Sequence, residues 1–200
     1  MSNLFDNKAE GWDTRTIPQQ LSATIGPAII EHVDLNPNME VLDFGAGTGL
    51  LTAHIAPLVK HVSAVDISQS MLDQLIAKPE LEGKVTAYCQ NILEKPLEKS
   101  FDLIVSAMAM HHVEHTREML QAFSKHLKPG ARVALADLDT EDGSFHPAEM
   151  EGIFHFGFDR DTFTTLLNEV GIKDVKFLTA HIIETDGKDY PVFLVLGQKA

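Results

Sequence analysis

The segment Asp43-Phe44-Gly45-Ala46-Gly47-Thr48-Gly49 constrains the fold of this chain more than any other, because its three glycines alternate directly after the short apolar run Met39–Phe44. Glycine adopts positive φ angles freely and lets a ligand approach bare backbone. The next residues, Leu50–Val59, can form a helix, whose first N–H groups would attract a carboxylate or a phosphate. The segment therefore predicts a tight turn between a buried strand and a helix.

Alternating strand and helix candidates fill the middle of the chain. Further strands are predicted at His61–Asp66, Lys84–Cys89, Phe101–Ala107 and Ala131–Leu138. Helices are predicted at Gln69–Ala77 and over two apolar stripes of helical spacing, at 119–127 and 163–170. Strands that are almost continuously apolar favour a parallel sheet covered on both faces. Repeated β-α units imply a doubly wound sheet, which binds ligands beyond the carboxyl ends of its strands.

The first 36 residues predict helical structure. Thr16 and Gln19 have the spacing of a capping box, in which side chains satisfy backbone N–H groups at the start of a helix. Gly26-Pro27 predicts a break or kink, because proline lacks the N–H that an interior helical position needs. Ala28–Val33 is then a second helical piece, which ends before Asn36-Pro37-Asn38.

Two strands are predicted close to the C-terminal end. The turn signal Asp186-Gly187 separates strand candidates at 175–183 and 191–197, which predicts a hairpin. A hairpin adds one antiparallel strand to a sheet that is otherwise parallel. The predicted fold is thus α/β, with a Rossmann-like doubly wound sheet of seven strands in a single domain, residues 1–200.

Composition bounds the partners of the chain. Its 200 residues, 44% of them hydrophobic, are enough to bury one core. The formal net charge is −13 without clusters of lysine and arginine, which disfavours nucleic acid and anionic membranes as main partners. Cys89 is the only cysteine, and Met1–Glu10 has no apolar run of the kind found in secretory signals. We therefore expect a cytoplasmic protein without integral membrane association, of unknown oligomeric state.

An acidic residue at the end of the second predicted strand completes the pattern. Asp66 can accept hydrogen bonds from both ribose hydroxyls of a nucleoside, in a dinucleotide or in S-adenosylmethionine. The dinucleotide fingerprint is G-x-G-x-x-G, whereas the three glycines here give G-x-G-x-G, with Leu50 at the position of the last glycine. Asp43 would repel a diphosphate but attract the ammonium group of a methionine moiety. These features disfavour an NAD(P)-dependent oxidoreductase.

Residues 41–49 resemble the first motif of the class I S-adenosylmethionine-dependent methyltransferases, and Asp66 matches the ribose-binding acid of that family. The segments that resemble its later motifs are Gln90-Asn91-Ile92, Phe101–Ser106 and Leu127–Gly130. The resemblance extends from Met39 to Leu138 and is greatest to small-molecule enzymes that include those of ubiquinone and menaquinone biosynthesis. It implies S-adenosylmethionine as the cofactor and a methyl group transferred to a small-molecule acceptor.

The resemblance also assigns residues to the cofactor. Asp43 would help to hold its methionine end, Asp66 its ribose, and Asn91 with Ile92 its adenine. The family often has an acid where this chain has Asn91, whose amide can still form a hydrogen bond to adenine. The residues expected to bind or line the cofactor site are Asp43, Gly45, Ala46, Gly47, Gly49, Asp66, Ile67, Asn91, Ile92 and Ala107. By the same resemblance, residues 1–36 form a helical lid segment and residues 37–200 the α/β core.

Histidines supply candidate catalytic residues on the acceptor side. His111 and His112 follow the fourth predicted strand, at the sheet edge beside the expected methyl group, and imidazole can act as a base near neutral pH. A phenol or thiol acceptor would benefit from such a base. Helix capping or packing against the cofactor is the alternative role of these two residues. His155 is a third and more distant candidate, in a segment whose four phenylalanines could bound an apolar acceptor.

No metal is predicted. Ser106-Ala107-Met108-Ala109 lacks the acid found at this strand end in metal-assisted catechol-type relatives, and it lacks the Asn/Asp-Pro-Pro-aromatic tetrad of nucleic-acid amino-methylating relatives. The residues that could form a nitrogen and oxygen ligand set, though without tight ligand spacing, are Asp137, Asp139, His146 and His155 with His111 or His112.

The sequence also allows functions other than methyl transfer to a small molecule. A methyltransferase-fold binding or regulatory module without turnover would keep the same motifs. A protein-modifying methyltransferase is less favoured, because no separate peptide-docking domain is evident in 200 residues. The sequence predicts neither the identity of the acceptor nor the atom that is methylated.

Overall fold

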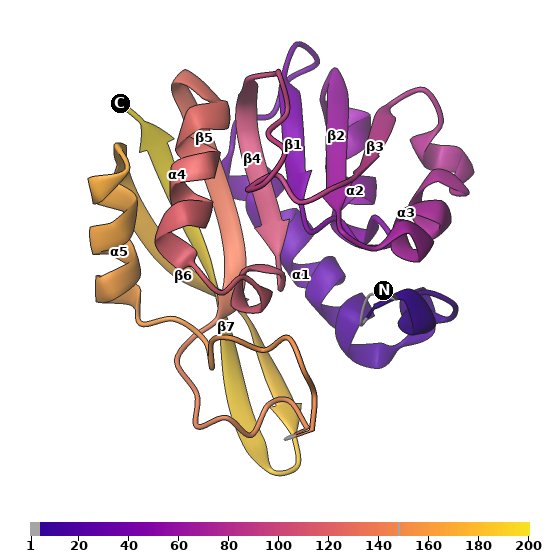
Figure 1. Cartoon of the computed structure of the whole chain (residues 1–200), viewed down its shortest axis with the longest axis vertical. Helices are drawn as coiled ribbons and strands as arrows, with labels where there is room; N and C mark the ends of the chain where they lie inside the picture. The colour runs from indigo at the N-terminus through magenta and orange to yellow at the C-terminus, as the bar shows by residue number, and fades with distance from the viewer. Residues whose placement is uncertain (1–4, 148) are drawn as a thin grey trace.

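The computed structural model of this protein describes residues 5–147 and 149–200. Within them, a seven-stranded sheet has the order β3-β2-β1-β4-β5-β7-β6 (Figure 1). The strands are β1 (Glu40–Phe44), β2 (His61–Asp66), β3 (Val85–Cys89), β4 (Phe101–Ala107), β5 (Leu127–Leu138), β6 (Ile172–Thr185) and β7 (Lys188–Lys199). The helices are α1 (Thr16–His32), α2 (Leu50–Ile55), α3 (Gln69–Ile76), α4 (Thr116–His126) and α5 (Arg160–Glu169). The predicted α/β fold is confirmed.

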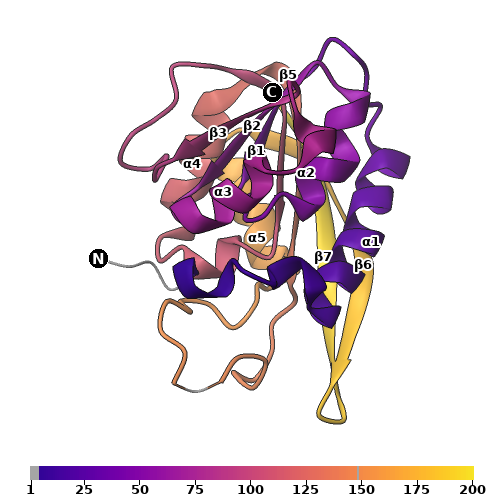
Figure 2. The ribbon, with the colours of Figure 1, turned by 90° about the vertical axis from the view of Figure 1, so that its right-hand side faces the viewer.

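Alternation along the parallel strands produces two cores, one on each face of the sheet. Val41 belongs to the core under α1, α2 and α3, whereas the next residue, Leu42, belongs to the core under α4 and α5. Both side chains are fully buried, so β1 is apolar on both faces, as predicted for a central strand. Figure 2 shows α1 on one side of β6 and β7 and α5 on the other. The strand order reverses at β1, which pairs in parallel with both β2 and β4.

The C-terminal hairpin is confirmed. β7 runs antiparallel to both β5 and β6. Asp186 and Gly187 connect the two strands with φ angles of 51° and 74°, the positive values that suit a two-residue hairpin turn. The turn end of this hairpin and residues 139–147 and 149–158 extend together beyond the other strands (Figure 1). A bridge between Asp139 and Phe158 closes the base of the 139–158 loop.

The predicted break at Gly26-Pro27 is wrong, because α1 is continuous from Thr16 to His32. Proline removes one backbone hydrogen bond, but the buried face of α1 packs against the core and holds the helix together. The glycine serves packing instead, since a Cβ at Gly26 would lie 2.5 Å from the ring of His54 on α2. The predicted capping box is also wrong, because Arg15 is the N-cap residue and no side chain caps the helix.

The fifth strand begins at Leu127 and not at Ala131 as predicted. Pro129-Gly130 therefore lies inside β5 and does not separate a helix from a strand. The pairing with β4 shifts register between Phe101 and Leu103, and such irregular positions tolerate a proline in a sheet. The helix predicted after the glycine-rich turn is shorter than expected, because α2 is followed by a 3-10 turn at Ala56–Leu58.

The helices of the described residues are short. The longest, α1, has 17 residues. Within residues 5–147 and 149–200, no helix combines the length and apolar character needed to cross a membrane.

Candidate active site

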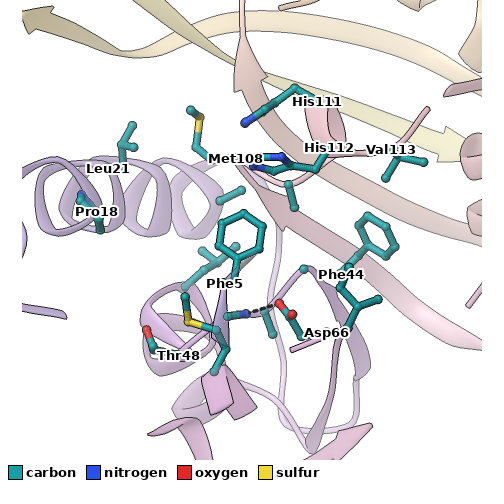
Figure 3. Close-up of a pocket in the computed structure, with 18 of the residues that line it drawn as sticks. Phe5, Pro18, Leu21, Phe44, Thr48, Asp66, Met108, His111, His112 and Val113 are labelled. Carbon is teal, nitrogen blue, oxygen red and sulfur yellow. Dashed lines mark hydrogen bonds between the residues drawn. The ribbon is translucent and has the colours of Figure 1, made fainter. Parts of the chain in front are cut away.

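A large cavity lies beyond the carboxyl ends of β1, β2 and β4, next to the point where the strand order reverses. Its volume is about 1070 Å³. In open α/β sheets this position is the usual ligand site. Figure 3 shows residues of the N-terminal segment, the glycine-rich turn and the segment after β4 around it. The predicted cofactor residues on its wall are Asp43, Gly45, Ala46, Gly47, Asp66, Ile67, Asn91 and Ala107.

The glycine-rich turn after β1 exposes backbone to this cavity. Gly45 and Gly47 have φ angles of 68° and 55°, which favour glycine. The backbone N–H groups of Gly45 and Ala46 donate to the carbonyl oxygen of Val65 at the end of β2. A Cβ on Gly45 would lie 2.2 Å from the Cβ of Ala109, whereas a Cβ on Gly47 would meet nothing within 4 Å. Gly45 thus permits close packing, and Gly47 leaves open space at the wall.

Asp66, the last residue of β2, is anchored by backbone donors. The N–H of Gly47 donates to Oδ2 at 2.8 Å (Figure 3), and the N–H of Ser68 donates to Oδ1, also at 2.8 Å. Burial raises the pKa of Asp66, although these N–H groups oppose the shift. A carboxylate oxygen can accept two hydrogen bonds, so each oxygen retains capacity for a ligand hydroxyl. The side chain is therefore oriented to present its remaining lone pairs to the cavity.

Asp43 on β1 is the most buried acid on this wall, with 1% exposure. Its Oδ2 accepts a 2.6 Å hydrogen bond from the Thr52 hydroxyl. Burial raises the pKa of Asp43 to about 7; the Thr52 hydrogen bond opposes this shift and the charge of Asp66 adds to it. Among the described residues, no cationic side chain pairs with Asp43. A buried carboxylate without a counter-ion suits a ligand that brings a positive charge, such as an amino acid ammonium group.

Two of the predicted cofactor residues lie behind the wall. Ile92 is fully buried in the core under α4 and α5, and its neighbours Asn91 and Leu93 line the cavity in its place. Asn91 accepts from the Leu93 N–H and donates to Glu94, both at 3.0 Å. Gly49 is the N-cap of α2, where an added Cβ would lie 2.7 Å from Leu75. Gly49 therefore shapes the turn from within the core.

The N-terminal segment lies against the cavity mouth. It contains two 3-10 turns, Asp6–Lys8 and Trp12–Thr14. The Ser68 hydroxyl donates to Asp6 at 2.7 Å, and Asp13 accepts from the Thr48 hydroxyl and pairs with Lys78. These contacts attach the segment to α3 and to the glycine-rich turn. Residues 1–4 of the predicted lid lie outside the described residues, and the division into lid and core stays a prediction.

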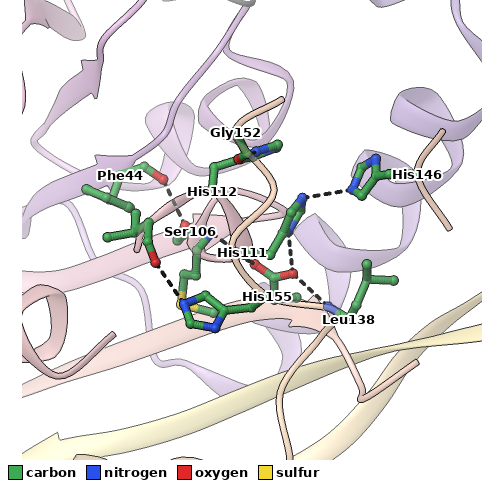
Figure 4. A network of polar contacts seen from close by, with 11 residues as sticks. Phe44, Ser106, His111, His112, Leu138, His146, Gly152 and His155 are labelled. Atoms are coloured by element: carbon green, nitrogen blue, oxygen red, sulfur yellow. Dashed lines mark hydrogen bonds and ion pairs between the residues drawn. The ribbon is translucent and has the colours of Figure 1, made fainter. Parts of the chain in front are cut away.

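A buried histidine–aspartate pair lies next to the cavity, with the His111 ring on the part of the wall that follows β4 (Figure 4). His111 Nδ1 lies 2.7 Å from Oδ1 of Asp137, the penultimate residue of β5. Asp137 also accepts the backbone N–H groups of Met110, His111 and Leu138. Burial alone raises the pKa of Asp137, but the His111 charge and these hydrogen bonds outweigh it and lower the pKa overall. Asp137 is therefore ionised at neutral pH and fixes the orientation of the His111 ring.

Two further histidines surround His111. The His112 ring lies 4.1 Å from it, and His112 Nδ1 is 2.8 Å from the Gly152 carbonyl oxygen. His146 Nε2 is 3.2 Å from His111 Nε2 (Figure 4). Burial and the neighbouring His111 lower the pKa of both His112 and His146 to about 4. All three histidines line the cavity, and both outer rings are neutral at physiological pH.

The structure places His155, the third predicted catalytic residue, outside the cavity. Its Nε2 lies 2.9 Å from the Val113 carbonyl oxygen and 3.1 Å from the Thr116 hydroxyl. These contacts connect the 139–158 loop to the start of α4. Of the four phenylalanines expected to bound an acceptor, Phe145 alone lines the cavity. Phe154 and Phe156 are exposed and Phe158 is buried in the core, so the predicted apolar wall is largely wrong.

Sequence reasoning missed two wall residues. The sequence suggests His146 only as a metal ligand. Its contact with His111 joins two residues that lie 35 positions apart in the chain. Lys8 had no distinguishing pattern; its ammonium lies on the cavity wall, and its only hydrogen-bond contact among the described residues is the Met150 sulfur at 3.9 Å. Only the fold brings these side chains together. Across residues 5–147 and 149–200, no three His, Cys, Asp or Glu side chains are grouped to hold a metal ion.

Comparison with known proteins identifies the family. Residues 41–130 match the family described as Methyltransferase domain. An uncharacterized methyltransferase of Geobacillus sp. (strain WCH70) is 30% identical over 175 residues, which cover 82% of this chain and 80% of the relative. An uncharacterized methyltransferase of Schizosaccharomyces pombe is 34% identical over 135 residues, 60% of this chain. The matched part spans only about half, 48%, of that relative's length.

Solved structures share the fold. The N-methyltransferase NodS from Bradyrhizobium japonicum, in complex with S-adenosyl-l-homocysteine, superposes with a TM-score of 0.72 at 17% identity. The match covers 94% of this chain and 89% of NodS. The motif that surrounds the cavity, the matched family and the sheet order therefore agree. This chain belongs to the class I S-adenosylmethionine-dependent methyltransferases, and S-adenosylmethionine is its cofactor.

Proposed function

We propose that this protein transfers the methyl group of S-adenosylmethionine to a small-molecule acceptor bound in the same cavity. One observation carries the proposal: a single cavity joins the two carboxylates of β1 and β2 to the histidine cluster after β4. Its volume of about 1070 Å³ is at the upper end of small-molecule sites, about 300–1,000 Å³, so cofactor and acceptor can be held together.

The wall residues fit the cofactor group by group. Asp66 accepts the ribose hydroxyls with the lone pairs that Gly47 and Ser68 leave available. Asp43 faces the methionine ammonium, which supplies the positive charge that this buried carboxylate lacks. Asn91 and Leu93 lie where the adenine is expected. We assign the adenine contact to these two residues in place of Ile92. Bound there, S-adenosylmethionine supplies an electrophilic methyl group attached to a sulfonium.

The acceptor binds against the rest of the cavity wall. His111, His112 and His146 lie on it, together with Phe5 and Phe145. Its mouth is bordered by the N-terminal segment and the 139–158 loop, which are held to the core by side-chain hydrogen bonds. Such a site contributes to rate by positioning the acceptor and excluding water. Neutral histidines can in addition accept a proton from an acceptor that must be ionised before it attacks.

Calorimetric titration of the full chain tests the cofactor part of the proposal. S-adenosylhomocysteine should bind saturably, and Asp66→Ala should weaken binding about tenfold to a hundredfold, because a charged hydrogen-bond acceptor is lost. Asp73→Ala is the matched control, since Asp73 is an exposed acid on α3 outside the cavity. Equal affinities in both variants, or binding of NADH in place of S-adenosylhomocysteine, would reject the assignment.

Turnover tests the enzymatic part. With S-adenosylmethionine carrying a tritiated methyl group, label should appear in at least one small phenol, amine, thiol or carboxylic acid. Tight binding of S-adenosylhomocysteine without any such transfer would instead support a binding module or a macromolecular acceptor.

A further inference from the structure

The chain of contacts from Asp137 through His111 to His146 determines where protons sit. Asp137 is fully buried, and both of its oxygens accept backbone N–H groups, so it is a carboxylate. A carboxylate can only accept at the 2.7 Å contact, so His111 Nδ1 carries a hydrogen. In a neutral imidazole, the other nitrogen is then an acceptor. With a single hydrogen on its ring, His111 presents the lone pair of Nε2, and this neutral tautomer is the one that the relay requires.

This assignment fixes the state of His146. His146 Nε2 lies 3.2 Å from His111 Nε2, and a hydrogen bond at that contact needs one hydrogen between the two nitrogens. Because His111 Nε2 is the acceptor, His146 Nε2 is the donor. The bare nitrogen of the chain is therefore His146 Nδ1, on a ring that lines the cavity. His111 is not available to an acceptor, because His146 occupies its lone pair.

We propose that His146 is the catalytic base for an acceptor with a weakly acidic hydroxyl, a phenol or an enol, and that His111 with Asp137 positions it and carries the resulting charge. This inference rests on the proposed methyl transfer and names its acceptor class. The hydroxyl proton moves to His146 Nδ1, and the proton on His146 Nε2 moves to His111 Nε2. The hydroxyl oxygen bonds to the methyl carbon while the carbon–sulfur bond breaks and its electron pair stays on sulfur. His111 then returns the extra proton through His146 to water.

The surroundings favour this direction of proton movement. Burial and the adjacent His111 lower the pKa of His146 to about 4, so an added proton does not remain on His146. On His111 it lies beside the Asp137 carboxylate at 2.7 Å. The charged and titratable groups that act on His146 are His111, Asp137 and Lys8, and the His112 ring lies 6.0 Å from the His146 ring. The lysine opposes a charge on His146 itself.

His112 is the less suitable base. Its Nδ1 donates to the Gly152 carbonyl oxygen, so its free nitrogen also carries a lone pair. Among the described residues, no carboxylate contacts the His112 ring, and neither neighbouring imidazole is hydrogen-bonded to it. Burial and His111 lower its pKa to about 4. His112 thus lacks the relay that would make a proton transfer favourable.

Lys8 favours an acceptor that becomes negatively charged when it loses its proton. Its ammonium is partly buried on the cavity wall, 5.4 Å from the centroid of Phe5, and it forms no ion pair among the described residues. Burial and the charge of Arg15 lower the pKa of Lys8. A cation in this position is stabilised by an anion that arrives with the ligand. The developing oxyanion of a phenol or enol supplies that charge beside His146.

The first experiment reads proton positions and needs no acceptor. Long-range ¹H–¹⁵N spectra of the full chain, labelled at histidine and bound to S-adenosylhomocysteine, distinguish protonated from bare ring nitrogens. We expect His111 protonated at Nδ1, and His146 protonated at Nε2 and bare at Nδ1. His146→Gln serves to assign its signals. The opposite arrangement, with hydrogen on His111 Nε2, overturns the relay whatever the protein methylates.

The second experiment measures methyl transfer to 4-hydroxybenzoate, catechol, benzylamine and thiophenol. His146→Gln keeps a donor to His111 but removes the base, so kcat for a hydroxyl acceptor should fall about a hundredfold or more with KM little changed. Its rate should then rise about tenfold per pH unit towards the acceptor's own pKa, whereas the wild-type rate should change little over the same pH range, because His146 is already deprotonated there. His32→Gln, at an exposed histidine on α1 outside the cavity, is the control and should keep wild-type turnover.

The outcomes separate the two proposals. Turnover of a hydroxyl acceptor that His146→Gln leaves unchanged overturns the base and preserves methyl transfer. Turnover of benzylamine or thiophenol alone overturns the acceptor class. If none of the four acceptors is methylated, the proposed function is contradicted for their chemical classes. The tautomers of His111 and His146 then still test the proton relay.

Discussion

The two sides of the cavity are built differently. The half proposed for the cofactor consists of the glycine-rich turn, Asp66 and the residues after β3, and each lies at or directly after the carboxyl end of a parallel strand. The acceptor half consists of the histidine cluster, Asp137 and the 139–158 loop, whose members meet across 26 to 40 residues of sequence. Local turns that follow buried strands place the first half. Long-range hydrogen bonds place the second.

Each half therefore depends on different structural supports. In the cofactor half, backbone N–H groups orient Asp66 and the carbonyl of Val65 holds the turn. In the acceptor half, two hydrogen-bond contacts hold the 139–158 loop. The Gly152 carbonyl oxygen contacts His112 Nδ1, and His155 Nε2 contacts the carbonyl oxygen of Val113. A change in one half should leave the other largely intact. The following predictions test that separation on one scale, the affinity for S-adenosylhomocysteine.

Gly45→Ala should have the largest effect. The added methyl would lie 2.2 Å from Ala109 Cβ, at a φ angle of 68°, so the turn must move away from the segment after β4. Displacement of a binding turn by about 1 Å costs about a hundredfold in a positioned site, and we expect affinity to fall at least that far. Titration calorimetry measures the change.

Gly83→Ala is the control for this variant. Gly83 also has a positive φ, 72°, but an added Cβ there would meet nothing within 4 Å. Gly83→Ala should lower the free energy of unfolding by about 1–2 kcal/mol, because alanine is strained in the left-handed conformation. Its affinity for S-adenosylhomocysteine should not change. If Gly45→Ala behaves like Gly83→Ala, the turn does not form the cofactor site.

The pH dependence of binding should be intermediate in size. Burial raises the pKa of Asp43 to about 7, whereas a bound ammonium group requires the carboxylate. Below pH 7 the free protein must lose a proton to bind, so affinity should fall about tenfold per pH unit as the pH decreases. The same sign applies to folding: a raised carboxyl pKa stabilises the protonated native state at low pH, and that contribution is lost between pH 3.8 and about 7.

Asp43→Asn separates this residue from the other acids of the site. In that variant the slope of affinity between pH 7 and pH 5.5 should flatten, while affinity at pH 8 is reduced. Calorimetry in buffers of different ionisation enthalpy also counts the released proton. An unchanged slope in Asp43→Asn would show that another group, such as Asp66, is responsible.

Gly157→Ala should have the smallest effect on the cofactor. Its added Cβ would lie 2.0 Å from the Asp139 carbonyl oxygen, at a φ angle of 74°, so the base of the 139–158 loop must shift. S-adenosylhomocysteine affinity should change by no more than about threefold, because separate sites act nearly independently. Faster proteolytic cleavage within residues 139–158 and altered His146 resonances should accompany it. Loss of cofactor binding would show that the two halves are coupled.

Much of this fold follows from local pattern. The apolar runs that became β1, β2 and β4 are bounded by turn residues, and a parallel sheet is the arrangement that buries both of their faces. Asp66 also follows from this order, because it ends β2, which pairs in parallel with β1 and therefore ends beside the turn after β1. These predictions needed only the order of elements along the chain.

The errors arose where tertiary contacts override local preference. Pro27 did not interrupt α1, because the buried face of the helix on the core outweighs one missing hydrogen bond. Pro129-Gly130 became part of β5, because the pairing with β4 shifts register at that point. The resemblance assigns Ile92 to the adenine, but its side chain is fully buried in the core under α4 and α5 and does not line the cavity.

The sequence by itself therefore determined the order of strands and helices, the glycine-rich turn and the positions of the two carboxylates proposed to bind the cofactor, because each depends on residues close together in the chain. Only the tertiary structure decided the acceptor half. Asp137 meets His111 because β4 and β5 are adjacent and end at the same edge. His146 and Lys8 reach that edge from a loop and from the N-terminal segment. Their positions are set by packing across the whole chain, which leaves no periodicity or spacing in the sequence to reveal them.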